Sequence, residues 1–185
     1  MAGIFTKNMT NVMDVLLRDW YAGVSGIYFS FTDWQGNVVT RQSGASTMRT
    51  SYEMLAQSFN QMGTITVPTS SGSGNTGFTF LAFGSGTTEP TDDDYMVTSL
   101  ISTLTLSSVT CGKTVNGKQY TAVVMNGTAD PIDISEFALF TRVNVDGSGS
   151  ETLKTSIMLY HEVLEAPITL EPGQTATFTA ELTFV

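Results

Sequence analysis

From Thr64 to the C-terminus, turn residues break the chain at near-regular intervals, and this limits what the chain can fold into. Glycine-rich or proline-containing turns separate short runs of apolar and β-branched residues. Asn116-Gly117 is typical of a hairpin turn, and Pro172-Gly173 suits a type II turn. Many short strands separated by such turns are typical of a sandwich or a barrel. The pattern predicts a mainly β fold, with a β-sandwich domain of Greek-key or jelly-roll-like type over residues 64–185.

Residues 1–63 follow a different pattern, which predicts a partly helical N-terminal arm. Apolar side chains recur at helical spacing in residues 8–21, and again in residues 47–62. Residues 26–42 between them are aromatic-rich, turn at Asp33–Asn37 and return, which predicts a hairpin. We expect this arm to serve attachment or oligomerisation.

The first predicted helix has two interpretations. It packs on its own domain, or it docks on a neighbouring subunit, a role that suits large Met and Trp side chains near a chain end. The residues expected at a subunit contact are Ile4, Phe5, Met9, Met13, Leu16 and Trp20.

Charge is sparse and mostly negative. Only 14% of the residues are charged, against about 25% in a typical soluble domain. Uncharged surfaces are common where neighbouring subunits meet, although β-rich chains also favour Thr and Ser. A net charge of −9 with eight Lys and Arg disfavours binding to nucleic acid or to an anionic membrane. No apolar run approaches the ~18 residues that a membrane span needs.

Nothing at the N-terminus has the pattern of a signal peptide, and Cys111 is the only cysteine. No intrachain disulfide can therefore form, which suits assembly in a reducing cytoplasm.

Motifs for catalysis fail one by one. Gly112-Lys113-Thr114 resembles the end of a phosphate-binding loop, but Ser107 stands where that loop needs glycine. His161 is the only imidazole and Cys111 the only thiol, and no local pattern joins them. We therefore predict no catalytic residue and no cofactor, with His161 as a packed or edge-exposed side chain.

Metal motifs fail as well. Asn144, Asp146 and Ser148 alternate as in a calcium loop, but Thr155 stands where that loop needs Glu. A hairpin turn is the better interpretation of this segment. Asp92-Asp93-Asp94 is expected to cap a turn, so we predict no metal site.

The aromatic residues of the first hairpin suggest an alternative function. Trp34, Tyr28 and Phe29 could stack on sugar rings, as in a carbohydrate- or host-surface-binding β-sandwich module.

The C-terminal half carries a recognisable order of motifs. Phe83-Gly-Ser-Gly-Thr-Thr-Glu-Pro-Thr91 is followed by an acidic run, then by Asp133-Ile-Ser-Glu-Phe-Ala-Leu-Phe140. His161-Glu-Val-Leu-Glu-Ala-Pro-Ile-Thr-Leu-Glu-Pro-Gly173 comes next, before a last strand. Over residues 78–185 this order resembles small structural proteins of tailed bacteriophages, of tail-fibre, head-fibre or decoration type. Ala138 departs from the pattern, because the group usually has Gly there. Gly84 and Gly86 are expected to supply positive φ angles in the first turn.

The resemblance implies a virion structural protein, assembled in the cytoplasm of a host bacterium. It implies a homo-oligomer, a trimer or a ring, in the neck, tail or fibre base or as a head decoration. Capsid, portal or tail components would be its other partners. Its mechanism would be burial of apolar area at subunit contacts rather than catalysis.

Overall fold

The computed structural model describes residues 3–18, 28–42, 62–63, 65–68, 79–144 and 154–183. It holds one helix, α1 (Lys7–Arg18), and nine strands in these ranges. The strands are β1 (Ile4–Phe5), β2 (Tyr28–Thr32), β3 (Val38–Gln42), β4 (Thr79–Gly84), β5 (Leu104–Lys113), β6 (Gly117–Asn126), β7 (Ile132–Asn144), β8 (Lys154–Leu170) and β9 (Thr175–Thr183). Most of the predicted helix at 47–62, and the polar segment after Asn144, lie outside the described residues.

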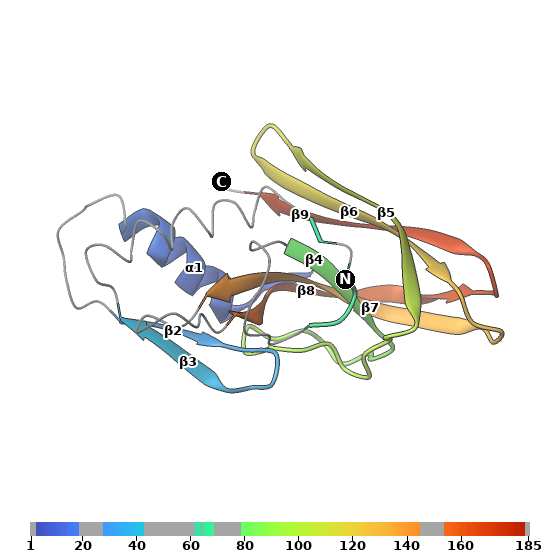
Figure 1. Ribbon diagram of the computed structural model, residues 1–185, viewed down its shortest axis with the longest axis horizontal. Helices are drawn as coiled ribbons and strands as arrows, with labels where there is room; N and C mark the ends of the chain where they lie inside the picture. The colour runs from blue at the N-terminus through green and yellow to red at the C-terminus, as the bar shows by residue number, and fades with distance from the viewer. Residues whose placement is uncertain are drawn as a thin grey trace.

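Two antiparallel sheets form the body of the protein (Figure 1). One has the strand order β1-β8-β7-β4 and the other the order β5-β6-β9. Along the chain, the β5–β6 hairpin of one sheet is inserted between β4 and β7, which pair with each other in the opposite sheet. The β7–β8 hairpin is likewise inserted in the chain between β6 and β9, which pair with each other. These nested connections confirm the predicted mainly β, sandwich-like fold with a helix near the N-terminus.

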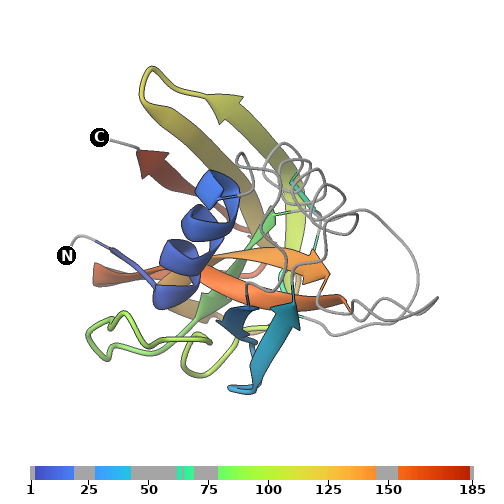
Figure 2. The same ribbon diagram turned by 90° about the vertical axis from the view of Figure 1, so that its left-hand side faces the viewer.

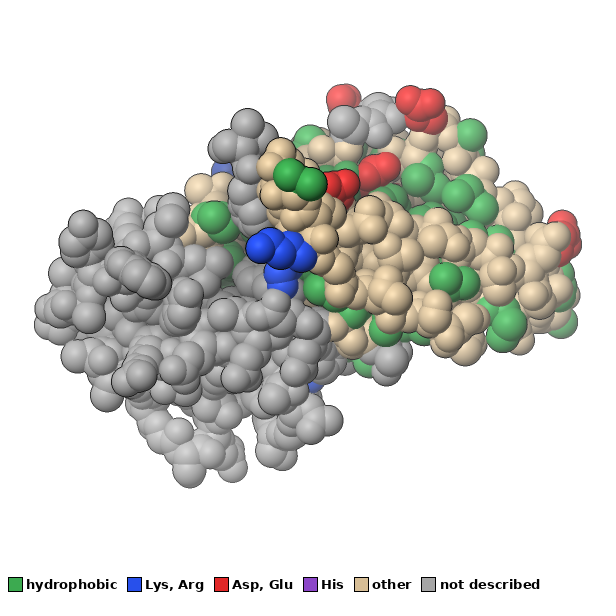
Figure 3. Space-filling model, turned by 90° about the horizontal axis from the view of Figure 1, so that it is seen from above, with side chains coloured by type: hydrophobic (Ala, Val, Ile, Leu, Met, Phe, Trp, Pro, Cys, Tyr) green, Lys and Arg blue, Asp and Glu red, His purple; other side chains and the backbone are tan. Residues whose placement is uncertain are grey.

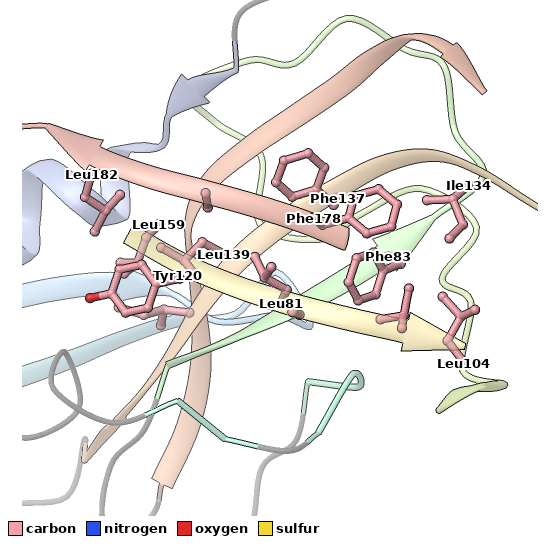
Figure 4. Close-up of a cluster of buried hydrophobic side chains, with 14 of the residues drawn as sticks. Leu81, Phe83, Leu104, Tyr120, Ile134, Phe137, Leu139, Leu159, Phe178 and Leu182 are labelled. Atoms are coloured by element: carbon pink, nitrogen blue, oxygen red, sulfur yellow. The ribbon is translucent and has the colours of Figure 1, made fainter. Parts of the chain in front are cut away.

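The inner faces of the two sheets meet in the main hydrophobic core (Figure 4). Strands β6 and β9 of the three-stranded sheet alternate, so that every second side chain points inward, whereas a register shift between Leu106 and Ser108 interrupts the pattern of β5. The Phe178 ring of β9 lies with its centroid 4.9 Å from that of Phe83 and 5.5 Å from that of Phe137. Aromatic contacts across the layers therefore hold the sheets together.

The four-stranded sheet is buried on its outer face too. All six residues of β4 are buried, which explains its continuous apolar sequence. A second cluster covers this outer face: Phe80, Ala82, Ala138, Phe140, Met158 and, from the long β4–β5 connection, Val97. That connection, residues 85–103, is thereby placed over the outer face of the sheet.

The described part of the N-terminal segment is built onto the sandwich. Ile4 and Phe5 pair with His161 and Tyr160 of β8. The Thr6 backbone N–H donates to the carbonyl of Leu159 at 3.0 Å. Met9 and Val12 of α1 are buried in the main core. The helix therefore follows the first interpretation, in which it packs on its own domain.

Asn8 joins the helix to the predicted hairpin of β2 and β3, which is present. Its side-chain amide donates to the Thr32 carbonyl at 2.7 Å, and its side-chain oxygen accepts from the Thr32 N–H at 2.8 Å. The Asn8 side chain thus makes the two hydrogen bonds to the Thr32 backbone that a neighbouring strand would otherwise make.

Both turns predicted from local sequence are present, one with a shift. Gly173 has a φ of 78°, as a type II turn requires, and the Gln174 N–H donates to the Glu171 carbonyl at 2.9 Å. In the β5–β6 hairpin, Gly117 belongs to β6 and the turn lies one residue earlier than predicted. A Cβ at Gly117 would lie 1.8 Å from the Leu182 carbonyl oxygen, so glycine is needed there for close approach to β9.

Truncation of the aromatic contact between the sheets should be costly. Phe178→Ala should lower the free energy of unfolding by about 3–5 kcal/mol, because it leaves a cavity between the layers. The control Thr177→Ala alters an exposed neighbour on β9 and should change it by less than about 0.5 kcal/mol. Urea denaturation followed by circular dichroism measures both, and equal effects would contradict the assigned core.

Candidate functional site

A buried ionic centre lies on the outer face of the four-stranded sheet. His161 of β8 stands between two carboxylates: its Nδ1 is 2.6 Å from Asp94 Oδ2, and its Nε2 is 2.7 Å from Glu136 Oε2. Glu136 comes from β7 and Asp94 from the β4–β5 connection. The Glu136 and His161 side chains are 1% and 3% exposed, whereas that of Asp94 is 24% exposed. The centre therefore joins two strands to the loop that covers them.

Sheet register brings the two buried members together. His161 lies directly opposite Ala138 in the β7–β8 ladder. Glu136 precedes Ala138 by two residues and shares its face of the sheet, so it is a diagonal neighbour of His161. The small Ala138 methyl group leaves space beside the imidazole ring.

Two glycines allow the loop to reach the Glu136 carboxylate. The Gly86 N–H donates to Glu136 Oε1 at 2.9 Å. A Cβ at Gly84 would lie 2.4 Å from that oxygen, and one at Gly86 would lie 2.5 Å from it. The expectation that these glycines supply positive φ angles was wrong, because the described glycines with positive φ are Gly36 and Gly173. Gly84 and Gly86 are needed for space.

Asp94 is oriented by its own turn. Thr91 donates to it from the backbone N–H at 3.0 Å and from Oγ1 at 2.7 Å. The acidic run thus caps a turn, as expected, and also contacts the histidine. Its other members reach the N-terminal segment: Lys7 Nζ lies 2.5 Å from Asp93 Oδ1 and 3.8 Å from Asp92 Oδ1.

The two contacts favour a protonated imidazole. In that form His161 can donate a hydrogen bond from each ring nitrogen. Burial by itself lowers the pKa of His161, but the hydrogen bonds to Glu136 and Asp94 outweigh it and raise the pKa above its ordinary value. Burial likewise raises the pKa of Asp94, but hydrogen bonds from Thr91 and His161 outweigh it and lower that pKa. The centre thus places the imidazole of His161 between two carboxyl groups.

Both ring nitrogens of His161 contact carboxylates within the centre. A histidine acts as a general base through a free ring nitrogen, and both nitrogens of His161 are occupied. Cys111 lies in β5 of the other sheet, and burial raises the pKa of its thiol, which disfavours the reactive thiolate. The two carboxylates face different ring nitrogens, and no group of three or more His, Cys, Asp or Glu side chains among the described residues is placed to hold a metal.

The residues expected at a subunit contact have different positions. Met9 is buried in the chain's own core, and Ile4 and Met13 are partly buried. Phe5 is 43% exposed and packs edge-on against the Tyr160 ring. The side chain of Leu16, and all of Trp20, lie outside the described residues.

Of the three residues expected to stack on sugar rings, only Trp34 has a side chain among the described residues. Trp34 is partly buried and packs against the second cluster, and its backbone N–H donates to the Ser156 carbonyl at 3.0 Å. Tyr28 and Phe29 are consecutive residues of β2. Their side chains lie outside the described residues.

Sequence reasoning missed the ionic centre, although a signal was present. Glu136 and His161 each interrupt an apolar, strand-like run. A charged side chain in a buried strand is seldom tolerated unless it has a partner. Two such interruptions in one chain could have suggested that the residues meet.

Comparison with protein-family models, curated proteins and solved structures found no match for this chain. Within the described part of the chain, no helix is long and apolar enough to cross a membrane.

The ionic centre predicts a pH dependence with a defined sign. Since the His161 pKa is raised by folding, its contribution is complete below its unfolded value of about 6.5 and is lost as pH rises through the folded value. Since the Asp94 pKa is lowered, its contribution is present above about 4 and is lost as pH falls through the folded value. His161→Gln should therefore cost most between about pH 4 and 6.5.

Urea denaturation of the wild type and of His161→Gln between pH 3 and pH 9 measures this difference. Removal of one partner from a buried ionic group typically costs about 3–5 kcal/mol. A difference that does not vary with pH would contradict the protonated state.

The need for space beside the Glu136 carboxylate can be tested with a matched pair of alanine substitutions at Gly86 and Gly112. Gly86→Ala should cost about 1–3 kcal/mol, because its Cβ would collide with Glu136 Oε1 and with Thr98. Gly112→Ala on β5 should be neutral or stabilising, because nothing lies within 4 Å of its Cβ. Melting temperatures of the two variants and of the wild type measure these effects. An unchanged melting temperature of Gly86→Ala would contradict the need for glycine at this position.

Proposed function

We propose that this chain is a structural subunit of a tailed-bacteriophage particle. It assembles with copies of itself and with other virion proteins, in the neck, tail or fibre base or on the head. One observation carries the proposal: the separate motifs of the phage resemblance meet in a single buried centre. Gly86, Asp94, Glu136 and His161 belong to four different motifs and are joined by direct contacts.

This convergence gives the resemblance a physical basis. Turn motifs taken one at a time recur in many β proteins. Residues that are far apart in the sequence, and that together hold one loop on one sheet, are much less expected by chance. The motifs that carry the resemblance therefore meet at residues that hold the β4–β5 connection on the sheet.

A fixed loop suits a protein that works by contact. Besides the ionic centre, the Ile101 N–H donates to the Phe83 carbonyl at 2.8 Å and the Ser85 N–H to the Ser99 carbonyl at 3.3 Å. Both ends of the β4–β5 connection are thus tied to the sheet. A surface that is already ordered loses little conformational entropy when it binds.

The outer face of the three-stranded sheet also suits assembly. Figure 3 shows that the side chains over this sheet are mostly uncharged. Threonines dominate the outward positions of β9, and Thr179 Oγ1 lies 3.1 Å from Thr121 Oγ1 of β6. On a chain with a net charge of −9, such a face lets copies approach with little repulsion.

The proposal predicts that the chain is present in particles. Antibodies raised against the recombinant chain should label particles of the bacteriophage that carries its gene, at one fixed position in immunogold electron microscopy. Particles from a strain with the gene deleted are the control. Purified particles that lack the chain would disprove the proposal.

A further inference from the structure

Strand β9 forms one edge of the three-stranded sheet. In the strand order β5-β6-β9 it pairs with β6, and this ladder runs from Thr175 to Thr183 without a register shift. In Figure 2 it is the dark red strand beside the C label, with β6 and β5 on its other side. Among the described residues, no hydrogen bond between backbone groups reaches the free side of β9. Within the described part of the chain, β9 is therefore an open sheet edge.

The ladder geometry identifies the backbone groups at this edge. Successive pairs in an antiparallel ladder alternate between residues that exchange hydrogen bonds and residues that do not. The Asn126 N–H donates to the Gln174 carbonyl at 3.0 Å, so the even-numbered residues of β9 direct their N–H and C=O groups toward β6. The odd-numbered residues direct theirs away from β6, and their side chains are exposed: Thr175, Thr177, Thr179, Glu181 and Thr183. The free edge thus presents a row of backbone donors and acceptors.

The other sheet edges in the described part of the fold are each interrupted. Backbone N–H groups from outside the strands' own ladders donate to carbonyls of β4 and β8, namely those of Thr79, Phe83, Ser156 and Leu159. Strand β5 has a register shift between Leu106 and Ser108 and ends on Lys113. Covers, register shifts and lysines of this kind keep a sheet edge from pairing with another chain. Strand β9, by contrast, is regular over all nine residues and carries one charge, Glu181.

We propose that β9 pairs antiparallel with β9 of a second copy, so that the two three-stranded sheets become one continuous sheet. This inference deepens the proposed function and rests on its claim of self-assembly. In the proposed register, Thr179 lies opposite Thr179 of the second copy, Thr177 opposite Glu181, and Thr175 opposite Thr183. Each of these pairs exchanges two hydrogen bonds, which satisfies the whole edge. The contact is self-complementary, so it closes as a two-fold dimer.

The side chains of β9 fit this register. Phe178 lies opposite Ala180 of the second copy, and Ala176 opposite Leu182, so apolar residues face apolar residues. Glu181 lies opposite an uncharged threonine, whereas a register with Glu181 opposite its own copy would bring like charges together. On a chain with a net charge of −9, a contact with few charges lets two copies approach. These matches favour a second copy of the chain as the partner.

Charged substitutions in the full-length chain test the contact and its register. Thr179→Glu places like charges opposite each other at the two-fold axis, so it should raise the dissociation constant of self-association about tenfold or more at low salt. Thr177→Lys places a lysine opposite Glu181 and should lower that constant about threefold or more. The double variant Thr177→Lys/Glu181→Lys places lysine opposite lysine, so it should associate more weakly than the wild type although its net charge is less negative. Sedimentation velocity over a concentration series measures all four proteins.

Thr110→Glu is the matched control for Thr179→Glu. Thr110 is exposed on β5, at the other edge of the same sheet, and Thr110 and Thr179 both lie opposite Thr121 of β6. The two substitutions change the net charge equally, but Thr110→Glu should leave the dissociation constant within about threefold of the wild-type value. Because both sites are exposed, both variants should melt within about 4 °C of the wild type, which shows that they fold.

Amide hydrogen exchange of the wild type gives a second measurement that needs no variant. The N–H groups of Thr177, Thr179 and Glu181 point away from β6, so their exchange should slow about tenfold or more when the chain is concentrated enough to associate. The N–H groups of Phe178 and Ala180 point toward β6 and should be protected at every concentration. NMR spectra recorded at low and high concentration compare the two sets.

The outcomes distinguish this contact from the wider proposal. If the wild type associates and Thr179→Glu does not weaken it, the contact is wrong, while assembly by another surface stands. If Thr110→Glu weakens association instead, the edge that pairs is β5 and not β9. If the double variant associates as tightly as Thr177→Lys, the proposed register is wrong. If the wild type stays monomeric throughout the series, the contact is also wrong, and the function is then decided by the presence of the chain in particles.

Discussion

A protonated histidine between two carboxylates connects the parts of this protein that the backbone ladders leave separate. Each buried ion would cost several kcal/mol if it were left alone. Here the carboxyl groups have several partners: Glu136 accepts from Gly86 and contacts His161, and Asp94 accepts from Thr91. With these contacts the centre fixes one arrangement of the loop on the sheet, because a shift of the loop would leave a buried group without its hydrogen-bond partner.

The consequences extend to both neighbours of the centre. The held loop covers a second apolar cluster, so the four-stranded sheet is buried on two faces although it is antiparallel. The N-terminal strand pairs with β8 at His161 itself, and Lys7 reaches the acidic residues beside Asp94. The N-terminal segment, the loop and the centre are therefore energetically coupled. An N-terminal deletion would disturb the fold as well as any contact with another subunit.

The same coupling bears on assembly. A chain with few charges and a net negative potential associates best through surfaces that are either neutral or matched in sign. The exposed threonine-rich face of β9 is a nearly neutral surface. The loop is held by a buried centre of its own chain, so the fold alone fixes the surface that the loop presents.

The sequence by itself determined the class of fold and several local features. Short runs of apolar and β-branched residues between turns predicted the strands, and Pro172-Gly173 predicted its turn, because these depend on neighbouring residues and on backbone sterics. The tertiary structure alone decided that α1 packs on its own core, that Gly84 and Gly86 provide space, and that His161 lies between Glu136 and Asp94. Those facts depend on strand register and on the path of a long connection. Both are set by the sum of many distant contacts, which no local pattern in the chain records.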